Sequence, residues 1–309
     1  QISLAYFQFF AIARRILQKG GSDCMTARIG VIGGSGVYDF EGVEYREEVY
    51  PDTPYGKPSD SIRIGTYGER ELAFLPRHGR THRLSPSNVP YAANIYALKT
   101  LGVEWIIALN AVGSLRMEMA PLHLVIPDQL IDRTRSRVNT LFDPIAVHVG
   151  FADPFCDSLR QVLIRAAKEC DLTVHEKGTY ICMEGPLFST RAESHLYRSW
   201  GAHLIGMTAL PEAKLAREAE ICYATIASVT DYDCWHEEEE TVDIQMVIRN
   251  LLKNAENVKK VVLKAIPYIP ESRDGDPCAS ALATAVISKP QDFPPDKREA
   301  FEFLTKKYL

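Results

Sequence analysis

Hydrophobic residues along this chain follow two alternating patterns, short apolar runs and longer segments with helical spacing. The short runs are typical of buried strands, and the spaced segments are typical of amphipathic helices. Strands are predicted over 28–32, 71–76, 103–109, 122–126, 178–183, 202–207 and 221–229. Helices are predicted over 88–101, 153–170, 190–200, 210–219 and 241–265, with a short terminal helix over 297–308. This alternation predicts an α/β fold with a mixed, twisted central sheet flanked by helices.

Local signals mark several element ends. Asp153 followed by Pro154 predicts an N-cap with proline at the first helical position for the helix over 153–170. Gly201 is expected to end the helix predicted over 190–200. Glutamates 237–240 suit the positive N-terminal end of the long helix, so we interpret them as electrostatic support rather than a metal site. Residues 41–70 and 128–150 are irregular in pattern and predict loops, with short hairpins in the first.

Length and composition limit how many domains the chain can form. At 309 residues with 46% hydrophobic content, the chain can bury a core as one large domain or two small ones. Residues 1–24 are apolar and then basic, and we expect an extension that is dispensable for the fold, with organelle targeting as the alternative. Residues 25–270 form the predicted main domain, and 271–309 a C-terminal tail.

Charge and cysteine content narrow the function classes. The formal net charge of −5 argues against a general nucleic-acid binder, which needs a basic excess. Seven cysteines without a CxxC pair indicate neither a disulfide framework nor a zinc site, and favour a reducing, cytoplasmic location. No apolar run reaches the roughly 18 to 20 residues of a spanning helix, so no membrane partner is expected.

Polar residues gather where predicted strands end, and the first group is the glycine-rich turn 33–36. Backbone N–H groups in such a turn form an anion-binding nest, and the Ser35 hydroxyl adds a donor. The spacing matches neither the dinucleotide fingerprint nor a Walker A loop, which argues against a dehydrogenase or an NTP site. Taken alone, the stretch is equally consistent with a tight turn that binds nothing.

A second group, Arg77, His78 and Arg80, follows the predicted strand 71–76. His78 and His82 have the spacing of a helical metal pair, but the intervening Gly79 disfavours a helix there. Arginine's fork suits phosphate, so the group indicates an anion site, with a solvated basic loop as the alternative.

The third group is Asp231 and Asp233, which follow the predicted strand 221–229. Two carboxylates at i and i+2 are suited to a flat ligand that donates hydrogen bonds, although an Asx turn that ends the strand is the alternative. Ligands of open α/β sheets bind at the carboxyl ends of strands, where Asn110 and Thr208 also lie. An anion site beside a carboxylate pair and the aromatic Phe188 describes a nucleoside with phosphate.

Nine motifs, in order, carry a resemblance to a known family. They are IGVIGGSG (29–36), DTPYGKPSD (52–60), RHGRTH (77–82), NAVGSLR (110–116), DQLIDRT (128–134), HVGFADPFC (148–156), EGPLFSTRAES (184–194), GMTALPE (206–212) and ATIASVTDYDCW (224–235). The chain resembles the trimer-forming purine nucleoside phosphorylase superfamily, most closely the 5′-methylthioadenosine phosphorylases, over about residues 27–270. The resemblance implies a single-domain nucleoside phosphorylase fold, and a transferase that converts 5′-methylthioadenosine and phosphate to adenine and 5-methylthioribose 1-phosphate.

The resemblance also implies site residues. Phosphate is expected at Ser35, Arg77, His78, Thr208 and the backbone around Asn110 and Ala111. Met207 is expected against the ribose, Phe188 and Ser189 in the base pocket, and Asp231 and Asp233 at the purine N7 edge and 6-amino group. Ile244, Val247 and Ile248 are the expected pocket for the 5′-methylthio group, and His148 is expected to reach a neighbouring subunit's site in a homotrimer.

Phosphorolysis explains these residue types. Fixed phosphate stabilises an oxocarbenium-like sugar and then adds to it, so that positioning supplies much of the rate. An aspartic acid with a raised pKa donates a proton to the departing base, and we expect Asp231 to be this acid, paired with Asp233. No metal or organic cofactor is expected.

Substrate choice depends on the same loop. A carboxylate accepts a hydrogen bond from a 6-amino purine and disfavours a 6-oxo purine, and relatives that use 6-oxopurines have Asn and Glu where Asp231 and Ser189 align. Asn110, residues 117–119, the region 136–147 and the tail beyond 270 depart from the animal enzymes' pattern. A broader or 6-oxopurine phosphorylase and a non-catalytic nucleoside-binding protein remain the rival hypotheses.

Overall fold

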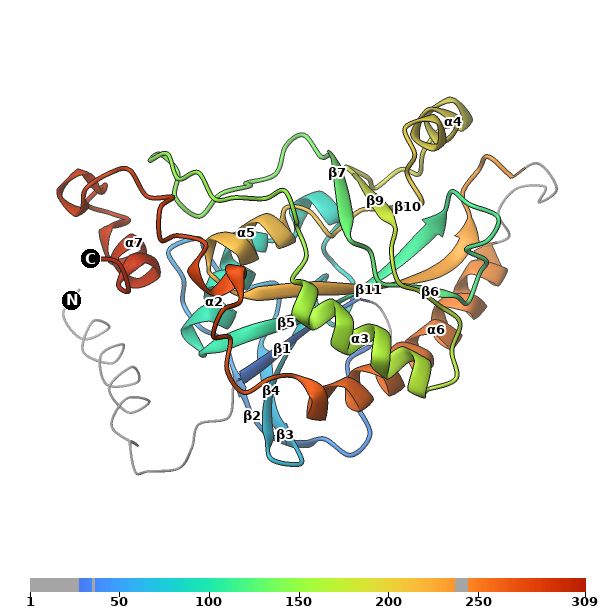
Figure 1. Cartoon of the computed structure of the whole chain (residues 1–309), viewed down its shortest axis with the longest axis horizontal. Helices are drawn as coiled ribbons and strands as arrows, with labels where there is room; N and C mark the ends of the chain where they lie inside the picture. Colours follow the sequence, from blue (N-terminus) through green and yellow to red (C-terminus); the bar gives the residue numbers. More distant parts are fainter. Residues whose placement is uncertain (1–27, 35–36, 237–243) are drawn as a thin grey trace.

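The computed structural model describes residues 28–34, 37–236 and 244–309. Residues 1–24, Ser35 and the glutamates 237–240 lie outside the described residues, so the predictions made for them stay predictions. The described chain is an α/β structure in which eleven strands form one mixed sheet between helices (Figure 1). This agrees with the predicted fold class.

The sheet runs in the order β2-β3-β4-β1-β5-β10-β9-β7, and β11, β6 and β8 extend from the other edge of β5. The strands are β1 (Arg28–Gly33), β2 (Glu44–Val49), β3 (Ile62–Tyr67), β4 (Arg70–Pro76), β5 (Val103–Ser114), β6 (Leu124–Val125), β7 (Gln129–Arg133), β8 (Val174–His175), β9 (Thr179–Met183), β10 (Leu204–Gly206) and β11 (Cys222–Tyr232). The central neighbours β4, β1, β5 and β11 are parallel. Helices cover both faces of these strands, which explains why their sequences are largely apolar.

The central strand β5 has two different neighbours along one edge. Its first half pairs with β1 from Val103 to Ala108, whereas Gly113 and Ser114 pair with β10. Its opposite edge pairs continuously with β11. Residues 109–112 therefore lie between β1 and β10 on an edge that neither strand covers. This opening at the carboxyl ends of β1 and β4 is where a ligand is expected in an open α/β sheet.

The described helices are α2 (Tyr91–Thr100), α3 (Asp157–Glu169), α4 (Arg191–Ser199), α5 (Glu212–Glu218), α6 (Ile244–Ala265) and α7 (Arg298–Thr305), with short 3-10 turns η1 (Pro86–Asn88), η2 (Ile266–Tyr268), η3 (Pro277–Ser280) and η4 (Pro290–Asp292). Helices α2 and α5 pack on one side of the central strands and α3 and α6 on the other, whereas α4 and α7 lie toward the ends of the molecule (Figure 1). Buried residues of α2, α5 and α7 share one apolar core, and those of α3 and α6 share a second. Phe293 and Phe301 belong to the first core, so part of the segment 271–309 packs against the main domain.

Two predicted elements differ from the structure. The region 128–150 was expected to be irregular, but residues 129–133 form β7, a polar strand paired only with β9. The helix expected from Asp153 begins at Asp157, with Cys156 as its N-cap. The backbone N–H of Cys156 donates to the Tyr223 carbonyl at 2.8 Å, which holds the preceding residues against β11 before the helix begins.

The helix predicted over 190–200 forms as α4, and the structure adds a capping box at its start that the sequence analysis did not predict. Thr190 and Glu193 form a reciprocal capping box, in which the Thr190 hydroxyl accepts from the Glu193 N–H at 3.2 Å. Glu193 in turn accepts from the Thr190 N–H at 2.8 Å. Gly201, with φ of 82°, follows the helix as expected for a glycine just past its end.

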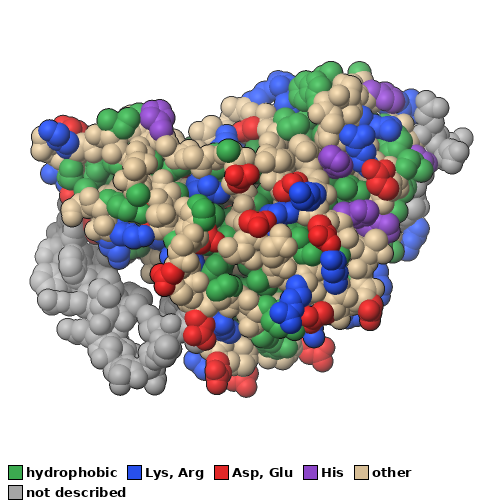
Figure 2. All heavy atoms as spheres, viewed as in Figure 1, with side chains coloured by type: hydrophobic (Ala, Val, Ile, Leu, Met, Phe, Trp, Pro, Cys, Tyr) green, Lys and Arg blue, Asp and Glu red, His purple; other side chains and the backbone are tan. Residues whose placement is uncertain are grey.

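The surface seen in Figure 2 has acidic and basic side chains intermixed over α3 and α6. Such a surface does not present the concentrated positive charge that nucleic acids require. Within the described ranges, the structure contains no helix with both the length and the apolar character to cross a bilayer.

Candidate active site

A cavity of about 320 Å³ occupies the opening beside residues 109–112 of β5. Its size is near the lower end of typical ligand pockets, about 300 Å³. Nine residues that the sequence singled out line it: Arg77, His78, Asn110, Ala111, Phe188, Met207, Thr208, Asp231 and Asp233. They come from the carboxyl-terminal parts of four strands, β4, β5, β10 and β11, and from the loop after β9. The sheet topology rather than local sequence therefore brings them together.

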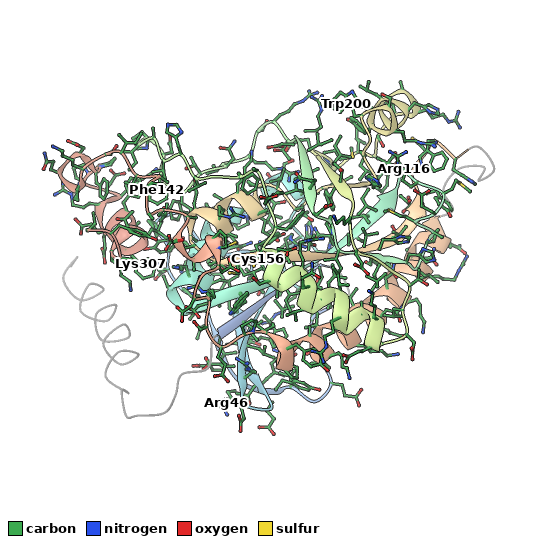
Figure 3. All side chains as sticks on the ribbon, viewed as in Figure 1. Arg46, Arg116, Phe142, Cys156, Trp200 and Lys307 are labelled. Carbon is green, nitrogen blue, oxygen red and sulfur yellow. The ribbon has the colours of Figure 1, made fainter. Side chains whose placement is uncertain are left out.

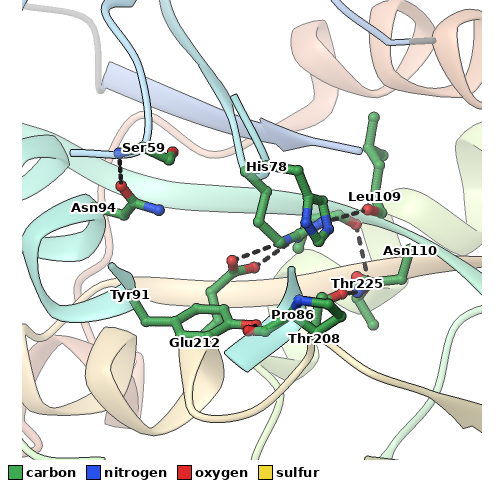
Figure 4. A network of polar contacts seen from close by, with 12 residues as sticks. Ser59, His78, Pro86, Tyr91, Asn94, Leu109, Asn110, Thr208, Glu212 and Thr225 are labelled. Atoms are coloured by element: carbon green, nitrogen blue, oxygen red, sulfur yellow. Dashed lines mark hydrogen bonds and ion pairs between the residues drawn. The ribbon is translucent and has the colours of Figure 1, made fainter. Parts of the chain in front are cut away.

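Arg77, directly after β4, anchors one end of the cavity. Its Nε and Nη2 donate to the two carboxylate oxygens of Glu212, each at 2.8 Å, and its Nη1 donates to the Leu109 carbonyl at 2.9 Å (Figure 4). Both side chains of this ion pair are buried, with 1% and 0% exposed. Burial alone would lower the pKa of Arg77, but the Glu212 charge and hydrogen bonds outweigh it and raise that pKa. These bonds use three of the five guanidinium N–H groups, which leaves two for a ligand.

Asn110 and Thr208 form a second buried contact at this end. The Asn110 Nδ2 donates to the Thr208 hydroxyl at 2.6 Å, and the Asn110 Oδ1 lies 2.5 Å from the Thr225 hydroxyl. The Thr225 contact fixes the orientation of the amide. Because Thr208 accepts from Asn110, its own hydroxyl hydrogen can point at an anion in the cavity.

His78 lies beside Arg77 in a buried position. Its Nδ1 is 2.8 Å from the Leu84 carbonyl, which can only accept, so Nδ1 carries a proton. Burial, followed by the positive charge of Arg77, lowers the pKa of His78 to about 4. His78 is therefore neutral near pH 7 and presents Nε2 as an acceptor. The sequence analysis placed His78 among anion donors, whereas in the structure its Nδ1 proton is already used by the Leu84 carbonyl.

Asp231 and Asp233 lie at the opposite end, and a β-bulge sets their position. The register of β11 against β5 shifts after Val229, so that Asp231 faces Gly113. A Cβ on Gly113 would be 3.3 Å from the Asp231 carboxylate and 3.5 Å from the Asp233 side chain, so glycine gives both carboxylates room. The Ser189 hydroxyl lies 2.8 and 3.0 Å from the two Asp233 oxygens, and the Thr230 hydroxyl donates to Asp231 at 2.6 Å.

The side wall between the two ends contains Met207 and Phe188. A Cβ on Gly185 would be 2.5 Å from the Met207 sulfur, so the glycine lets the loop after β9 pack closely against this side chain. Arg137 fixes the same wall, because its Nη1 donates to the carbonyls of Met207 and Leu210, each at 2.6 Å. Phe188 lines the cavity although 81% of it is exposed.

Comparison with known proteins identifies the family to which this arrangement belongs. Residues 28–267, which include every residue that lines the cavity, match the model of the phosphorylase superfamily. The chain belongs to the phosphorylase superfamily. It is also 51% identical over 286 residues to an S-methyl-5′-thioadenosine phosphorylase of Koribacter versatilis, covering 92% of this chain and 98% of that one.

Solved structures of the superfamily have the same fold. A methylthioadenosine phosphorylase from an antarctic soil metagenomic library superposes with a TM-score of 0.86 at 48% identity, covering 90% of this chain and 99% of that chain. Methylthioadenosine phosphorylase from Schistosoma mansoni in complex with adenine gives a TM-score of 0.79 at 35% identity, with 84% and 99% covered. The fold predicted from the resemblance is confirmed.

Several predicted site residues of this superfamily member are not at the cavity. His148 is exposed, and its backbone N–H donates to the Ala285 carbonyl at 3.1 Å. Ile248 is 50% exposed and is not among the lining residues, whereas Leu251, further along α6, is. Ser189 touches Asp233 rather than the cavity itself. Ser35 and the side chains of Ile244 and Val247 lie outside the described residues.

Two residues important to the geometry of this phosphorylase fold carried no assigned role in the sequence. Glu212 follows Pro211 at the start of α5, where we interpreted it as a helix former. Its position one residue after a proline, close behind a strand end, was the only available signal. Arg137 lies in a stretch without any periodic pattern, and nothing in the sequence indicates that it binds the Met207 and Leu210 carbonyls.

Proposed function

We propose that this protein catalyses the phosphorolysis of 5′-methylthioadenosine, which gives adenine and 5-methylthioribose 1-phosphate and contributes to purine and methionine salvage. The observation that carries the proposal is one cavity with a preformed anion-binding end and a carboxylate pair at the other end. Relatives about half identical along nearly the whole chain bear the corresponding enzyme name. Phosphate is a co-substrate, and no metal or organic cofactor is required for this reaction.

At the anion-binding end, Arg77, His78, Thr208 and the backbone at Asn110 and Ala111 bind phosphate. The ion pair with Glu212 supports this role, because it fixes the guanidinium before the ligand arrives. Phosphate held against C1′ stabilises the cationic sugar as the bond to the base breaks, and then adds to it. Preorganised donors of this kind need little reorganisation during the reaction.

At the base end, Asp231 donates a proton to the departing adenine at N7, and Asp233 accepts a hydrogen bond from the 6-amino group. The contacts from Ser189 to Asp233 and from Thr230 to Asp231 support a role for this pair, because they hold both carboxylates at the base end. Phe188 packs on the base, with Met207 against the ribose. Leu251 of α6 lines the cavity and contacts the 5′-methylthio group in this proposal, with Ile244 and Val247 kept as further candidates from the sequence.

The assembly and location are further parts of the proposal. We propose a cytoplasmic homotrimer in which His148 reaches the site of a neighbouring subunit. Exposed apolar side chains at α4, Leu196 and the C-cap residue Trp200, support burial against another copy. The free thiols among the described cysteines are consistent with a reducing compartment.

A phosphate-dependent assay on 5′-methylthioadenosine, adenosine and inosine in parallel tests the proposal. Adenine release from 5′-methylthioadenosine that requires phosphate, with inosine inert, is the expected result. Comparable cleavage of inosine would overturn the specificity argument built on Asp231 and Asp233. Binding of 5′-methylthioadenosine without turnover in the presence of phosphate would overturn the catalytic proposal.

A further inference from the structure

Three cysteines and an aspartate from distant parts of the chain meet away from the cavity. Cys156 is the N-cap of α3, Cys222 begins β11, and Asp276 and Cys278 lie at η3. One potential ligand atom from each residue lies within 4.8 Å of all the others. Figure 3 labels Cys156 near the centre of the molecule, at the start of α3. The cysteine spacing predicted no zinc site because these residues come together only in the folded chain.

Hydrogen bonds, several of them to the backbone, hold the residues of this cluster in place. The Cys156 N–H is bonded to the Tyr223 carbonyl at 2.8 Å, which ties the first thiol to the strand that carries Cys222. One oxygen of Asp276 accepts from the Cys278 N–H at 2.8 Å. The other oxygen accepts from the Cys156 thiol at 3.1 Å and from the Ser158 hydroxyl at 2.7 Å. The four groups therefore converge through strand pairing and a capped turn rather than through flexible side chains.

The cluster is buried and lies near a fixed cation. Cys156, Cys222 and Cys278 are 2%, 0% and 4% exposed. Arg217 lies close enough to Cys278 to interact with it electrostatically. Arg217 is itself held by the Gly150 and Asp153 carbonyls, at 2.9 and 2.6 Å. A fixed cation beside three thiols offsets part of the negative charge that thiolate ligands bring.

The donor set and its spacing match one class of ligand. In a tetrahedral zinc site the metal–sulfur distance of about 2.3 Å places ligand atoms roughly 3.8 Å apart, which the cluster approaches without large movement. Thiolates select zinc and similar ions, whereas Mg²⁺ and Ca²⁺ require oxygen ligands. A disulfide would use only two of the three sulfurs and leave the carboxylate without a role.

We propose that Cys156, Cys222, Cys278 and Asp276 bind one thiophilic divalent metal ion, with Zn²⁺ as the first candidate. Binding displaces the thiol protons to solvent, as expected when protonated cysteines become ligands. The site shares no residue with the cavity and links the segment after α6 to α3 and β11. Its role is structural, and it is independent of the proposed reaction.

Cobalt binding by the reduced, metal-free full-length protein tests the site. We expect a thiolate-to-cobalt charge-transfer band that saturates at one equivalent of Co²⁺ and disappears when Zn²⁺ is added. Cys278→Ser is expected to weaken Co²⁺ binding by at least about tenfold. Cys170→Ser is the matched control, because Cys170 is a free thiol at the other end of α3. Phosphorolysis is expected to survive in both variants.

Three outcomes would overturn the metal proposal. The first is the absence of a saturable cobalt band in the reduced wild type. The second is an equal weakening of Co²⁺ binding in Cys170→Ser and Cys278→Ser. The third is peptide mapping that finds two of the three cysteines joined as a disulfide in the isolated protein. If Cys278→Ser does not fold, Asp276→Asn serves as the second variant, since it keeps all thiols and is expected to shift the cobalt spectrum. An unchanged spectrum in Asp276→Asn would exclude the carboxylate as a ligand and overturn the four-ligand site.

Discussion

The two ends of the cavity are built differently. At the anion-binding end, Arg77, Glu212 and Asn110 are 1%, 0% and 3% exposed, and their polar atoms are bonded to partners on other strands and helices. At the base end, the neighbouring residues Leu187 and Phe188 are 82% and 81% exposed on the loop after β9. Among the described residues, the anion-binding end is buried and held by internal hydrogen bonds, whereas the base end has an exposed outer wall.

This difference follows from what each end must do. The anion-binding end must oppose charge that develops during the reaction, and rigid, buried donors act most strongly there. In the proposed reaction the base end must admit and release a flat, hydrogen-bonding base, so we expect its wall to be completed by the ligand or by another subunit. Four variants test the roles of the two ends, in order of decreasing expected effect.

Asp231→Asn is expected to have the largest effect. An amide cannot protonate the departing base, so kcat/KM for 5′-methylthioadenosine should fall by roughly 10²- to 10⁴-fold. The KM for phosphate should change little, because the anion-binding end is left intact. Steady-state kinetics measures both, with Asp171→Asn, a remote exposed aspartate, as the control. A variant that keeps the wild-type rate would refute the acid role.

Glu212→Gln tests the buried ion pair. It leaves the Arg77 charge buried with a neutral partner, so the free energy of unfolding should fall by about 3–5 kcal/mol. Urea unfolding measures the change. The control is Glu256→Gln, which removes an exposed pair with Lys253 and should cost about 1 kcal/mol or less. Equal losses in the two variants would show that Arg77 does not depend on Glu212.

Phe188→Ala tests the open wall. Loss of the aromatic face should raise the KM for the nucleoside by an amount equivalent to about 0.5–1.5 kcal/mol. Because Phe188 is exposed, the free energy of unfolding should change by no more than about 0.5 kcal/mol. Leu187→Ala is matched in exposure but does not line the cavity, and should leave KM unchanged. A larger effect from Leu187→Ala would contradict this assignment.

His78→Gln is expected to have the smallest effect on stability near neutral pH. Since the folded pKa of His78 is about 4 and its ordinary value is 6.5, the unfolded chain binds a proton that the folded chain does not between these values. This residue therefore reduces stability as the pH falls from 6.5 to 4. The variant should lose less Tm than the wild type over that window. Parallel Tm profiles for wild type and His78→Gln would contradict the lowered pKa.

The sequence predicted the central strands and much of the cavity because both leave local patterns. The parallel strands β1, β5 and β11 have mostly apolar central residues, and polar residues follow toward the carboxyl ends of β5 and β11, where the cavity lies. The polar edge strand β7 escaped prediction because its pairing with β9 depends on the whole sheet. The start of α3 was misplaced because a bond from Cys156 to β11 outweighs the local capping signal at Asp153.

Side-chain partners distant in the sequence were not predictable. Glu212 is 135 positions from Arg77, and no pattern in either segment indicates the pair. The cysteine cluster joins positions 156, 222 and 278 and has no spacing motif. The neutral state of His78 depends on burial and on Leu84, neither of which the motif reveals. The predicted roles of Ser35 and His148 stay predictions.

The uncovered edge of β5 also sets the distance between the two ends of the cavity. Between Ala108, the last partner of β1, and Gly113, the first partner of β10, the strand advances five residues. At about 3.3 Å per residue, this fixes the separation of the two ends of the cavity through backbone length alone. Substitutions around the cavity can change which atoms meet the ligand. Only an insertion or deletion in β5 would change the length of ligand that fits.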